Sequence, residues 1–271
     1  MSRPRVGRRE LVRMSEALAE RDWALMASLA EHRFLTTKHI EALHFDGHAS
    51  PLAAARATRR VLARLHQQRV ITHLDRRVGG VRAGSASYVW TLGPVGDRLL
   101  RQRRDDDGPR RRVYEPSATF LDHTLAIADA HVALVQGHRD GRLELVTVEV
   151  EPACWRSYLG AGGERLLLRP DSYVVTASGH FEDSWFVEID RGTEHLPTLM
   201  TKCHTYAAYR ATGREQADHD VFPRVVWSVP DQRRHDRLST ALDSARNLER
   251  DLFQVVLSDG LVALMVAGVQ A

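Results

Sequence analysis

The stretch RPDSYVVTASGHFEDSWFVEIDRGTEHLPTLMTKCHTY, from Arg169 to Tyr206, decides how the second half of this chain folds. Its runs 172–176 and 185–189 are rich in β-branched and aromatic residues, a composition that predicts two strands. Acidic residues stand at the ends of these strands and at the start of the helix that we expect next: Asp171, Glu188, Asp190 and Glu194. We therefore expect these carboxylates to converge on one point.

The chain on either side of this stretch completes a mixed α/β order. It provides a helix from Thr119, a strand over 143–150, a glycine-rich turn at 160–163, a helix from Glu194 to about Ala211 and a strand over 222–229. With the two strands above, these elements give the order α-β-β-β-α-β. Beyond them we expect a polar helix over 233–250 and a terminal hairpin over 253–266 that turns at Asp259-Gly260.

Converging carboxylates repel one another, so each raises the pKa of its neighbours until a cation lies among them. Mg²⁺ suits such a place because it takes one or two carboxylates and fills its other positions with water and phosphate oxygens. With a phosphodiester bound, such ions generate hydroxide and stabilise the leaving oxygen. The acids therefore indicate a candidate site for metal-assisted DNA cleavage.

The residues Pro170-Asp171 and Glu188-Ile189-Asp190, separated by a strand, resemble the motif of the PD-(D/E)xK nuclease superfamily. The resemblance covers about residues 119 to 230. It implies that Asp171 and Glu188 are the metal ligands, for Mg²⁺ or Mn²⁺. The third motif position is Asp190, where the superfamily usually has lysine, and Lys202 in the following helix is the residue that would replace it.

Two alternatives follow for this half of the chain. In one, Asp171, Glu188, Asp190 and Lys202 form the active site of a metal-dependent DNA endonuclease that nicks DNA. In the other, the nuclease-like fold is a scaffold, and its acids cap turns or pair with Arg191. Covalent nicking by Tyr206 or Tyr209 is a further alternative, although no motif singles out either tyrosine.

A charged segment divides the chain into two predicted domains. Residues 103–117 read RRDDDGPRRRVYEPS and lack apolar periodicity, so we place a linker at 104–118, between domains at 1–103 and 119–271. Residues 1 to 116 hold 23 bases and 13 acids, a balance of +10, and the rest holds 15 bases and 22 acids, a balance of −7. This asymmetry suggests a polyanion-binding first domain, unless the charges segregate by chance.

The strongest helix start in the first domain is Ser50-Pro51, because serine caps free amides and proline suits the first helical position. The predicted helix has an apolar side that we expect to face the core: Leu52, Ala55, Val61, Leu62 and Leu65. Its other side carries groups that contact phosphates and base edges, or form an ordinary solvated face: Arg56, Arg59, Arg60 and Gln67.

Two short strands, 70–74 and 88–92, flank a basic, glycine-rich tip after this helix. Three helices followed by such a ribbon resemble the winged helix-turn-helix family, with 51–69 as its recognition helix. The resemblance implies binding of double-stranded DNA, with further contacts from the wing: Arg76, Arg77 and Arg82. Winged helices also serve as protein-interaction modules, which is the alternative.

Taken as a whole, the chain resembles the replication-relaxation family of plasmid and mobile-element proteins. The residues that carry this resemblance are Arg21-Asp22, Phe34-Leu35-Thr36, His123 and Leu125, Arg169-Pro170-Asp171, the run from Phe186 to Glu194, Lys202 and Tyr206. It implies an α+β protein with a DNA-binding role in replication, relaxation, transfer or its transcriptional control. Such a protein binds its DNA site alone or as a homodimer.

Composition excludes several other classes. Two cysteines cannot build a disulfide framework or a four-thiolate zinc site, and no glycine-rich loop ending in Lys-Ser or Lys-Thr is present for NTP hydrolysis. The chain has no apolar run long enough to span a bilayer and no signal-peptide pattern at its start. We therefore expect a cytoplasmic protein without membrane contact.

Overall fold

The computed structural model describes residues 6–78, 87–106, 113–160, 162–178 and 181–268. It is a mixed α+β protein that divides into two compact units, Met1–Ala128 and Asp129–Ala271. The division falls inside one long helix, α6 (Ala118–Arg139), whereas the sequence places the boundary at 104–118. Residues 107–112 of that predicted linker lie outside the described residues.

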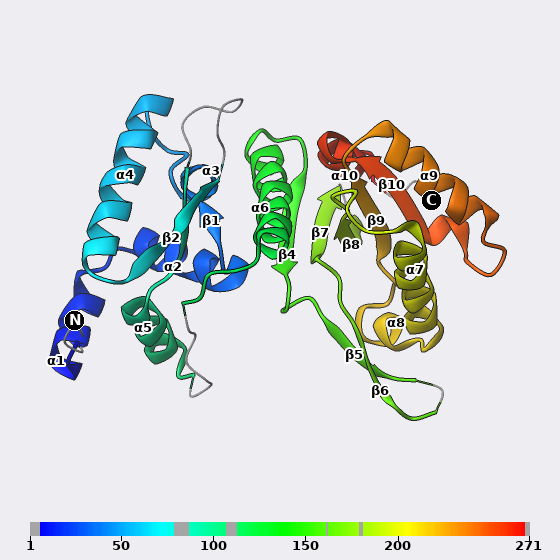
Figure 1. Ribbon diagram of the computed structural model, residues 1–271, viewed down its shortest axis with the longest axis horizontal. Coiled ribbons are helices and arrows are strands. Elements are labelled where there is room, and N and C mark those ends of the chain that lie inside the picture. Colours follow the sequence, from blue (N-terminus) through cyan, green and yellow to red (C-terminus); the bar gives the residue numbers. More distant parts are fainter. Residues whose placement is uncertain (1–5, 79–86, 107–112, 161, 179–180, 269–271) are drawn as a thin grey trace. The chain divides into compact units, whose positions relative to one another are not determined.

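The described part of the first unit consists of helices, a short strand and a two-stranded ribbon, followed by the first half of α6 (Figure 1). Its elements are α1 (Arg8–Ala17), α2 (Glu20–His32), β1 (Leu35–Thr36), α3 (Thr37–His44), α4 (Pro51–Gln67), β2 (Ile71–Val78), β3 (Ser87–Leu92) and α5 (Pro94–Arg104). The three strands form an antiparallel sheet in the order β1-β3-β2. The order helix, helix, helix, ribbon predicted from the sequence is present in α2, α3, α4 and β2–β3.

Side-chain caps begin two helices of this unit, α3 and α4. Thr36 Oγ1 accepts a hydrogen bond from the His39 backbone N–H at 3.1 Å, and Ser50 Oγ accepts one from Ala53 N–H at 3.2 Å. Each bond satisfies an amide that has no partner within its helix. Because Pro51 is the first residue of α4, both predicted start signals are confirmed there.

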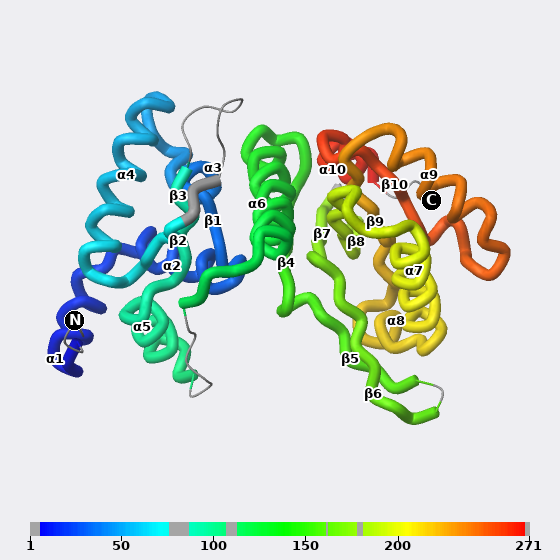
Figure 2. The backbone as a smooth tube through the Cα atoms, viewed as in Figure 1, coloured from blue at the N-terminus to red at the C-terminus, as the bar shows by residue number. Residues whose placement is uncertain are grey.

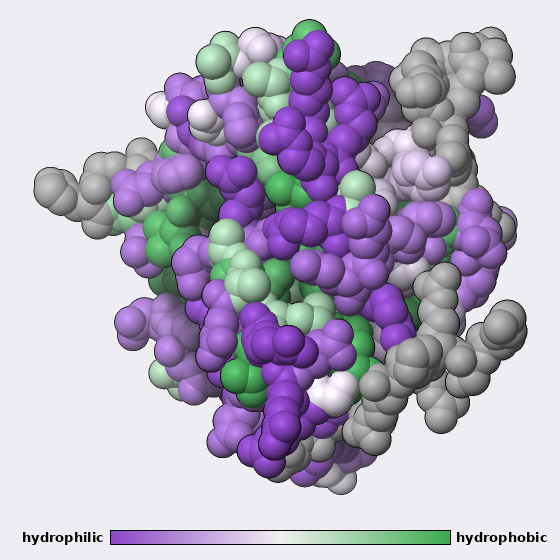
Figure 3. Space-filling model, turned by 90° about the vertical axis from the view of Figure 1, so that its left-hand side faces the viewer, coloured by the Kyte–Doolittle hydropathy of each residue, from purple (hydrophilic) through white to green (hydrophobic). Residues whose placement is uncertain are grey.

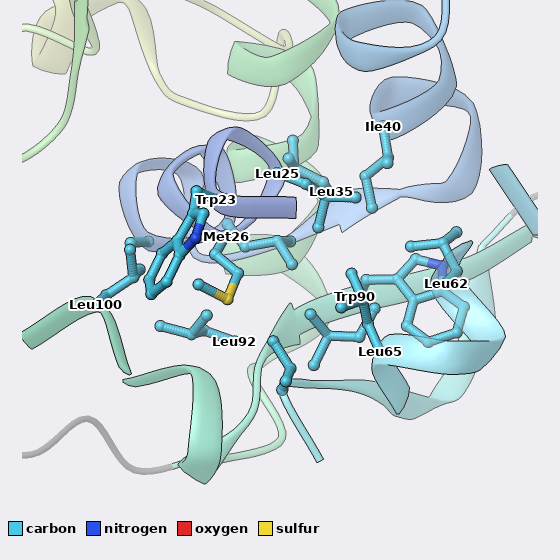
Figure 4. Packing of buried hydrophobic residues seen from close by; sticks show 14 of the residues in the cluster. Trp23, Leu25, Met26, Leu35, Ile40, Leu62, Leu65, Trp90, Leu92 and Leu100 are labelled. Atoms are coloured by element: carbon cyan, nitrogen blue, oxygen red, sulfur yellow. The ribbon is translucent and has the colours of Figure 1, made fainter. Parts of the chain in front are cut away.

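A large apolar cluster lies among α2, α4 and the sheet of the first unit (Figure 4). Its labelled members are Trp23, Leu25, Met26, Leu35, Ile40, Leu62, Leu65, Trp90, Leu92 and Leu100. Trp90 is anchored by its indole N–H, which donates to Thr37 Oγ1 at 2.9 Å. An ion pair of 2.6 Å between Arg64 and the buried Asp22 joins α4 to α2. The cluster fixes which side of α4 faces outward.

The second unit is built on a five-stranded sheet with the order β10-β9-β8-β7-β4. Its elements are β4 (Glu144–Val150), β5 (Arg156–Leu159), β6 (Arg165–Leu168), β7 (Ser172–Ser178), β8 (Phe181–Ile189), α7 (Leu196–Ala211), α8 (Arg214–His219), β9 (Arg224–Val229), α9 (Gln232–Ser244), β10 (Phe253–Leu257) and α10 (Leu261–Ala267). Strands β4, β7 and β8 pair antiparallel, and β8, β9 and β10 pair parallel. The predicted order α-β-β-β-α-β matches α6, β4, β7, β8, α7 and β9.

The sheet face that carries Tyr173, Phe186 and Trp227 packs against α7 and α9 and buries the aromatic core of this unit. Leu199, Tyr206 and Leu238 are helix residues buried against it. Strands β5 and β6 form a separate ribbon that extends away from the sheet (Figure 2). The sequence predicts only a glycine-rich turn there, because each flanking run is four residues long.

The predicted C-terminal hairpin is wrong. After β10 the chain forms a 3-10 turn, Ser258–Gly260, and then the helix α10. Leu261, Val262 and Met265 are buried on one side of this helix. Apolar residues that are one and four positions apart lie on one side of a helix. In a run this short, however, the same residues also fit a strand. The predicted helix over 233–250 also ends earlier, at Ser244.

Candidate functional site

Three of the predicted site residues meet on the α7 side of the sheet. Asp171 immediately precedes β7, and Glu188 lies in β8 opposite the start of that strand, since Ser172 pairs with Val187. Lys202 reaches them from α7: its ammonium group donates to Glu188 Oε2 and lies 3.8 Å from Asp171 Oδ1. Asp171 Oδ2 accepts the backbone N–H of Ile189 at 2.7 Å.

Tyr206 belongs to the same cluster. It follows Lys202 by one helical turn, and its hydroxyl donates to Glu188 Oε1. Residues four apart share a helix face, so the spacing of Lys202 and Tyr206 was the sequence signal for this contact. We call Asp171, Glu188, Lys202 and Tyr206 the Glu188 cluster.

The fourth predicted residue, Asp190, is held elsewhere. The guanidinium of Arg234 in α9 donates through Nε to Asp190 Oδ2 and through its terminal nitrogen to Oδ1 at 3.2 Å. Gly192 N–H also donates to Oδ1, at 2.9 Å. Because Arg234 further donates to the Glu194 carbonyl at 2.8 Å, this pair fixes the loop between β8 and α7.

Burial sets the protonation of the Glu188 cluster. Burial is the largest cause that raises the pKa of Glu188 to about 8; the Lys202 ammonium opposes this rise and Asp171 adds to it. Burial lowers the pKa of Lys202, but the neighbouring Glu188 and Asp171 outweigh that effect, so its pKa is raised overall. Lys202 therefore stays charged at every pH at which Glu188 titrates.

The two tyrosines considered for covalent nicking are buried hydrogen-bond donors. Tyr206 is fully buried against Glu188, and Tyr209 is 2% exposed and donates to Glu215. Burial is the largest cause that raises the pKa of both phenols, followed by their carboxylate partners. A buried, protonated phenol is a weak nucleophile with no access to a phosphodiester.

The Glu188 cluster is a poor match for a Mg²⁺ or Mn²⁺ site as it is arranged. Both oxygens of Glu188 and Oδ2 of Asp171 already accept hydrogen bonds, and the Lys202 ammonium supplies the positive charge between the carboxylates. Among the described residues no group of three or more His, Cys, Asp or Glu side chains could hold a metal ion. The carboxylate oxygens that would be the ligands of a cation are thus already paired with other groups of the chain.

A second candidate surface is the outward side of α4. All four of the polar residues predicted for this helix are exposed: Arg56, Arg59, Arg60 and Gln67. The opposite side is buried through Ala54, Thr58, Leu62 and Leu65. Leu52 is an exception to the prediction, because its side chain is 57% exposed rather than packed in the core.

The predicted wing is only partly described. Arg76 and Arg77 lie in β2, and Arg82 lies outside the described residues. In Figure 3, which looks at the left-hand side of Figure 1, hydrophilic residues cover most of the surface and smaller hydrophobic areas lie between them.

Comparison with known proteins gives one match. The family model described as Replication-relaxation matches residues 26–225. Neither a curated protein nor a solved structure matches the chain. No helix among the described residues has the length and apolar character needed to cross a membrane.

Proposed function

The chain belongs to the replication-relaxation family, and we propose that it binds double-stranded DNA in the replication, relaxation or transfer of a plasmid or other mobile element. The first unit is the DNA-binding part, as a winged helix-turn-helix with α4 as its recognition helix. The second unit is a nuclease-like scaffold.

The observation that carries this proposal is the exposed basic side of α4. A helix turns by about 100° per residue, so Arg56, Arg59 and Arg60 fall within about 100° of one another on its surface. Gln67 lies on the same side, two turns further on. Guanidinium groups bind phosphates and guanine edges, and an amide binds adenine, so the face has the chemistry of major-groove contact.

The surrounding elements support the same assignment. The core fixes the inner side of α4, the Arg64–Asp22 ion pair joins it to α2, and the ribbon β2–β3 follows it directly. This is the order in which a winged helix places a helix in the major groove and a ribbon beside it. The basic balance of residues 1 to 116 provides long-range attraction to DNA.

We expect Arg56→Ala combined with Arg60→Ala to weaken binding to duplex DNA by about ten-fold or more, because each substitution removes a phosphate or base contact. Fluorescence anisotropy of a labelled duplex measures the loss. The matched control is Arg233→Ala with Arg237→Ala, which also removes two exposed arginines four apart on a helix, in α9. Equal loss in both double variants would mean that net charge alone, and not α4, determines binding.

The scaffold assignment of the second unit rests on the internal pairing of the Glu188 cluster. Buried carboxyl groups that already accept hydrogen bonds from Lys202 and Tyr206 offer no open coordination position to a metal ion.

We expect supercoiled plasmid incubated with the protein and Mg²⁺ or Mn²⁺ to show no nicking beyond that of Asp171→Ala. Gel electrophoresis of the plasmid forms decides the question. Nicking by the unaltered protein that the Asp171→Ala variant lacks would contradict the scaffold assignment and establish the endonuclease alternative.

A further inference from the structure

The exposed face of α4 contains one large apolar side chain among its polar groups. Leu52 is 57% exposed, and a rotation of about 100° per residue places it in line with Arg56 and Ala63 along the helix. The exposed members of the helix that share this arc of about 100° are Leu52, Arg56, Arg59, Arg60, Ala63 and Gln67.

The start of α4 fixes where Leu52 stands. The Ser50 hydroxyl caps the helix at Ala53 N–H, and Pro51 is the first helical residue, so Leu52 lies in the first turn. In helix-turn-helix proteins the N-terminal residues of the recognition helix contact the base edges. Leu52 and, one turn later, Arg56 are the two exposed side chains at this end with the reach to do so.

We propose that Leu52 is a specificity-determining residue that contacts the C5-methyl group of a thymine in the major groove, an inference that rests on the proposed DNA binding by α4. The thymine methyl is the apolar group that a base pair presents in that groove. A leucine forms no hydrogen bond with the polar edges of the other bases. Beside such a base it leaves the edge desolvated and unpaired, which weakens binding to that sequence. Leu52 therefore sets a preference for thymine beside the base pair that Arg56 contacts.

The opposite interpretation is that Leu52 is an ordinary exposed surface residue. The chain contains a control residue that tests it. Val12 in α1 is 40% exposed and lies outside the α4 face. Single exposed apolar residues of this kind are common and carry no recognition by themselves. Substitution of Val12 therefore reports what loss of an exposed aliphatic side chain does to binding in general.

The test uses the full chain and duplexes selected by it from a pool with a randomised centre. Each thymine of a selected duplex is replaced in turn by uracil, which lacks only the C5-methyl group, and binding is measured for the unaltered protein, Leu52→Ala and Val12→Ala. We expect replacement at one or two positions to weaken binding of the unaltered protein and of Val12→Ala by about four-fold per methyl group. Leu52→Ala is expected to bind both duplexes equally.

The outcomes separate this inference from the function on which it rests. If Leu52→Ala keeps the same thymine preference as the unaltered protein, or if no thymine methyl affects binding, Leu52 does not read thymine. That result leaves DNA binding by α4 intact wherever Arg56→Ala with Arg60→Ala still weakens binding. If the arginine variants bind normally, or no duplex is selected, the proposed function fails and the role of Leu52 fails with it.

Discussion

Replacement of Arg234 by leucine is expected to lower the free energy of unfolding by about 3–5 kcal/mol, the largest effect of any single change considered for this protein. The Arg234 side chain is 8% exposed and that of its partner Asp190 is fully buried. Without the guanidinium, Asp190 becomes a buried charge that keeps, among the described residues, the Gly192 N–H as its donor. Urea unfolding followed by tryptophan fluorescence measures the change.

Two companion variants give this result its meaning. Arg233→Leu removes an exposed arginine from the preceding position and should leave stability unchanged within about 0.5 kcal/mol. Adding Asp190→Asn to Arg234→Leu removes the unpaired charge but keeps an oxygen for Gly192, so most of the lost stability should return. If the double variant is no more stable than Arg234→Leu, the charge of Asp190 is not the source of the loss.

Replacement of Lys202 by methionine is the second large change, and its effect depends on pH. Near pH 6 we expect a loss of about 1–2 kcal/mol, because Glu188 is protonated and the variant loses the hydrogen bond from the ammonium together with its attraction to Asp171, 3.8 Å away. Because the pKa of Glu188 is raised to about 8, this carboxyl group is ionised only above that pH. At pH 9 the variant must either keep Glu188 protonated or bury its unpaired charge, which should raise the loss to about 3 kcal/mol.

The sign of this pH dependence follows from proton binding. A carboxyl group whose pKa is higher in the folded state than in the unfolded state loses its contribution to stability as the pH rises through the folded value. Removal of the ammonium raises the pKa of Glu188 further. The free energy of unfolding of the variant therefore continues to fall at pH values above 8, where that of the unaltered protein no longer falls through this group. Unfolding at pH 6, 8 and 9 measures the widening gap.

The other lysine of the chain provides the control. Lys38 is exposed in α3, and Lys38→Met should change stability by less than about 0.5 kcal/mol at each pH. A loss for Lys202→Met that is the same at pH 6 and pH 9 would show that Lys202 contributes through packing rather than through its charge on Glu188.

Local signals in the sequence were sufficient for much of the fold. Ser50-Pro51 marks the start of α4 because capping and the φ angle of proline depend on neighbouring residues alone. The strands β7 and β8 follow from their β-branched and aromatic residues, and the motif at Asp171 and Glu188 placed two carboxylates that do meet Lys202.

Partners distant in the chain could not be predicted in this way. Asp190 pairs with Arg234, 44 positions later, and only the crossing of α9 over the loop after β8 brings them together. The sequence predicts Leu52 on the apolar side of its helix, but it lies on the same arc of α4 as Arg56, away from the side that Ala54, Leu62 and Leu65 bury. In the same way, four-residue runs are too short to identify β5 and β6 by periodicity.

The most direct test of the central claim is the salt dependence of duplex DNA binding, measured for the unaltered protein and for Arg56→Ala with Arg60→Ala. Each phosphate contact contributes about 0.9 to the slope of the logarithm of the binding constant against the logarithm of salt concentration. If both arginines of α4 contact phosphates, the slope should fall by about 2 in the double variant and stay unchanged in Arg233→Ala with Arg237→Ala. An unchanged slope and affinity in the α4 variant would contradict the assignment of this helix as the DNA-binding surface.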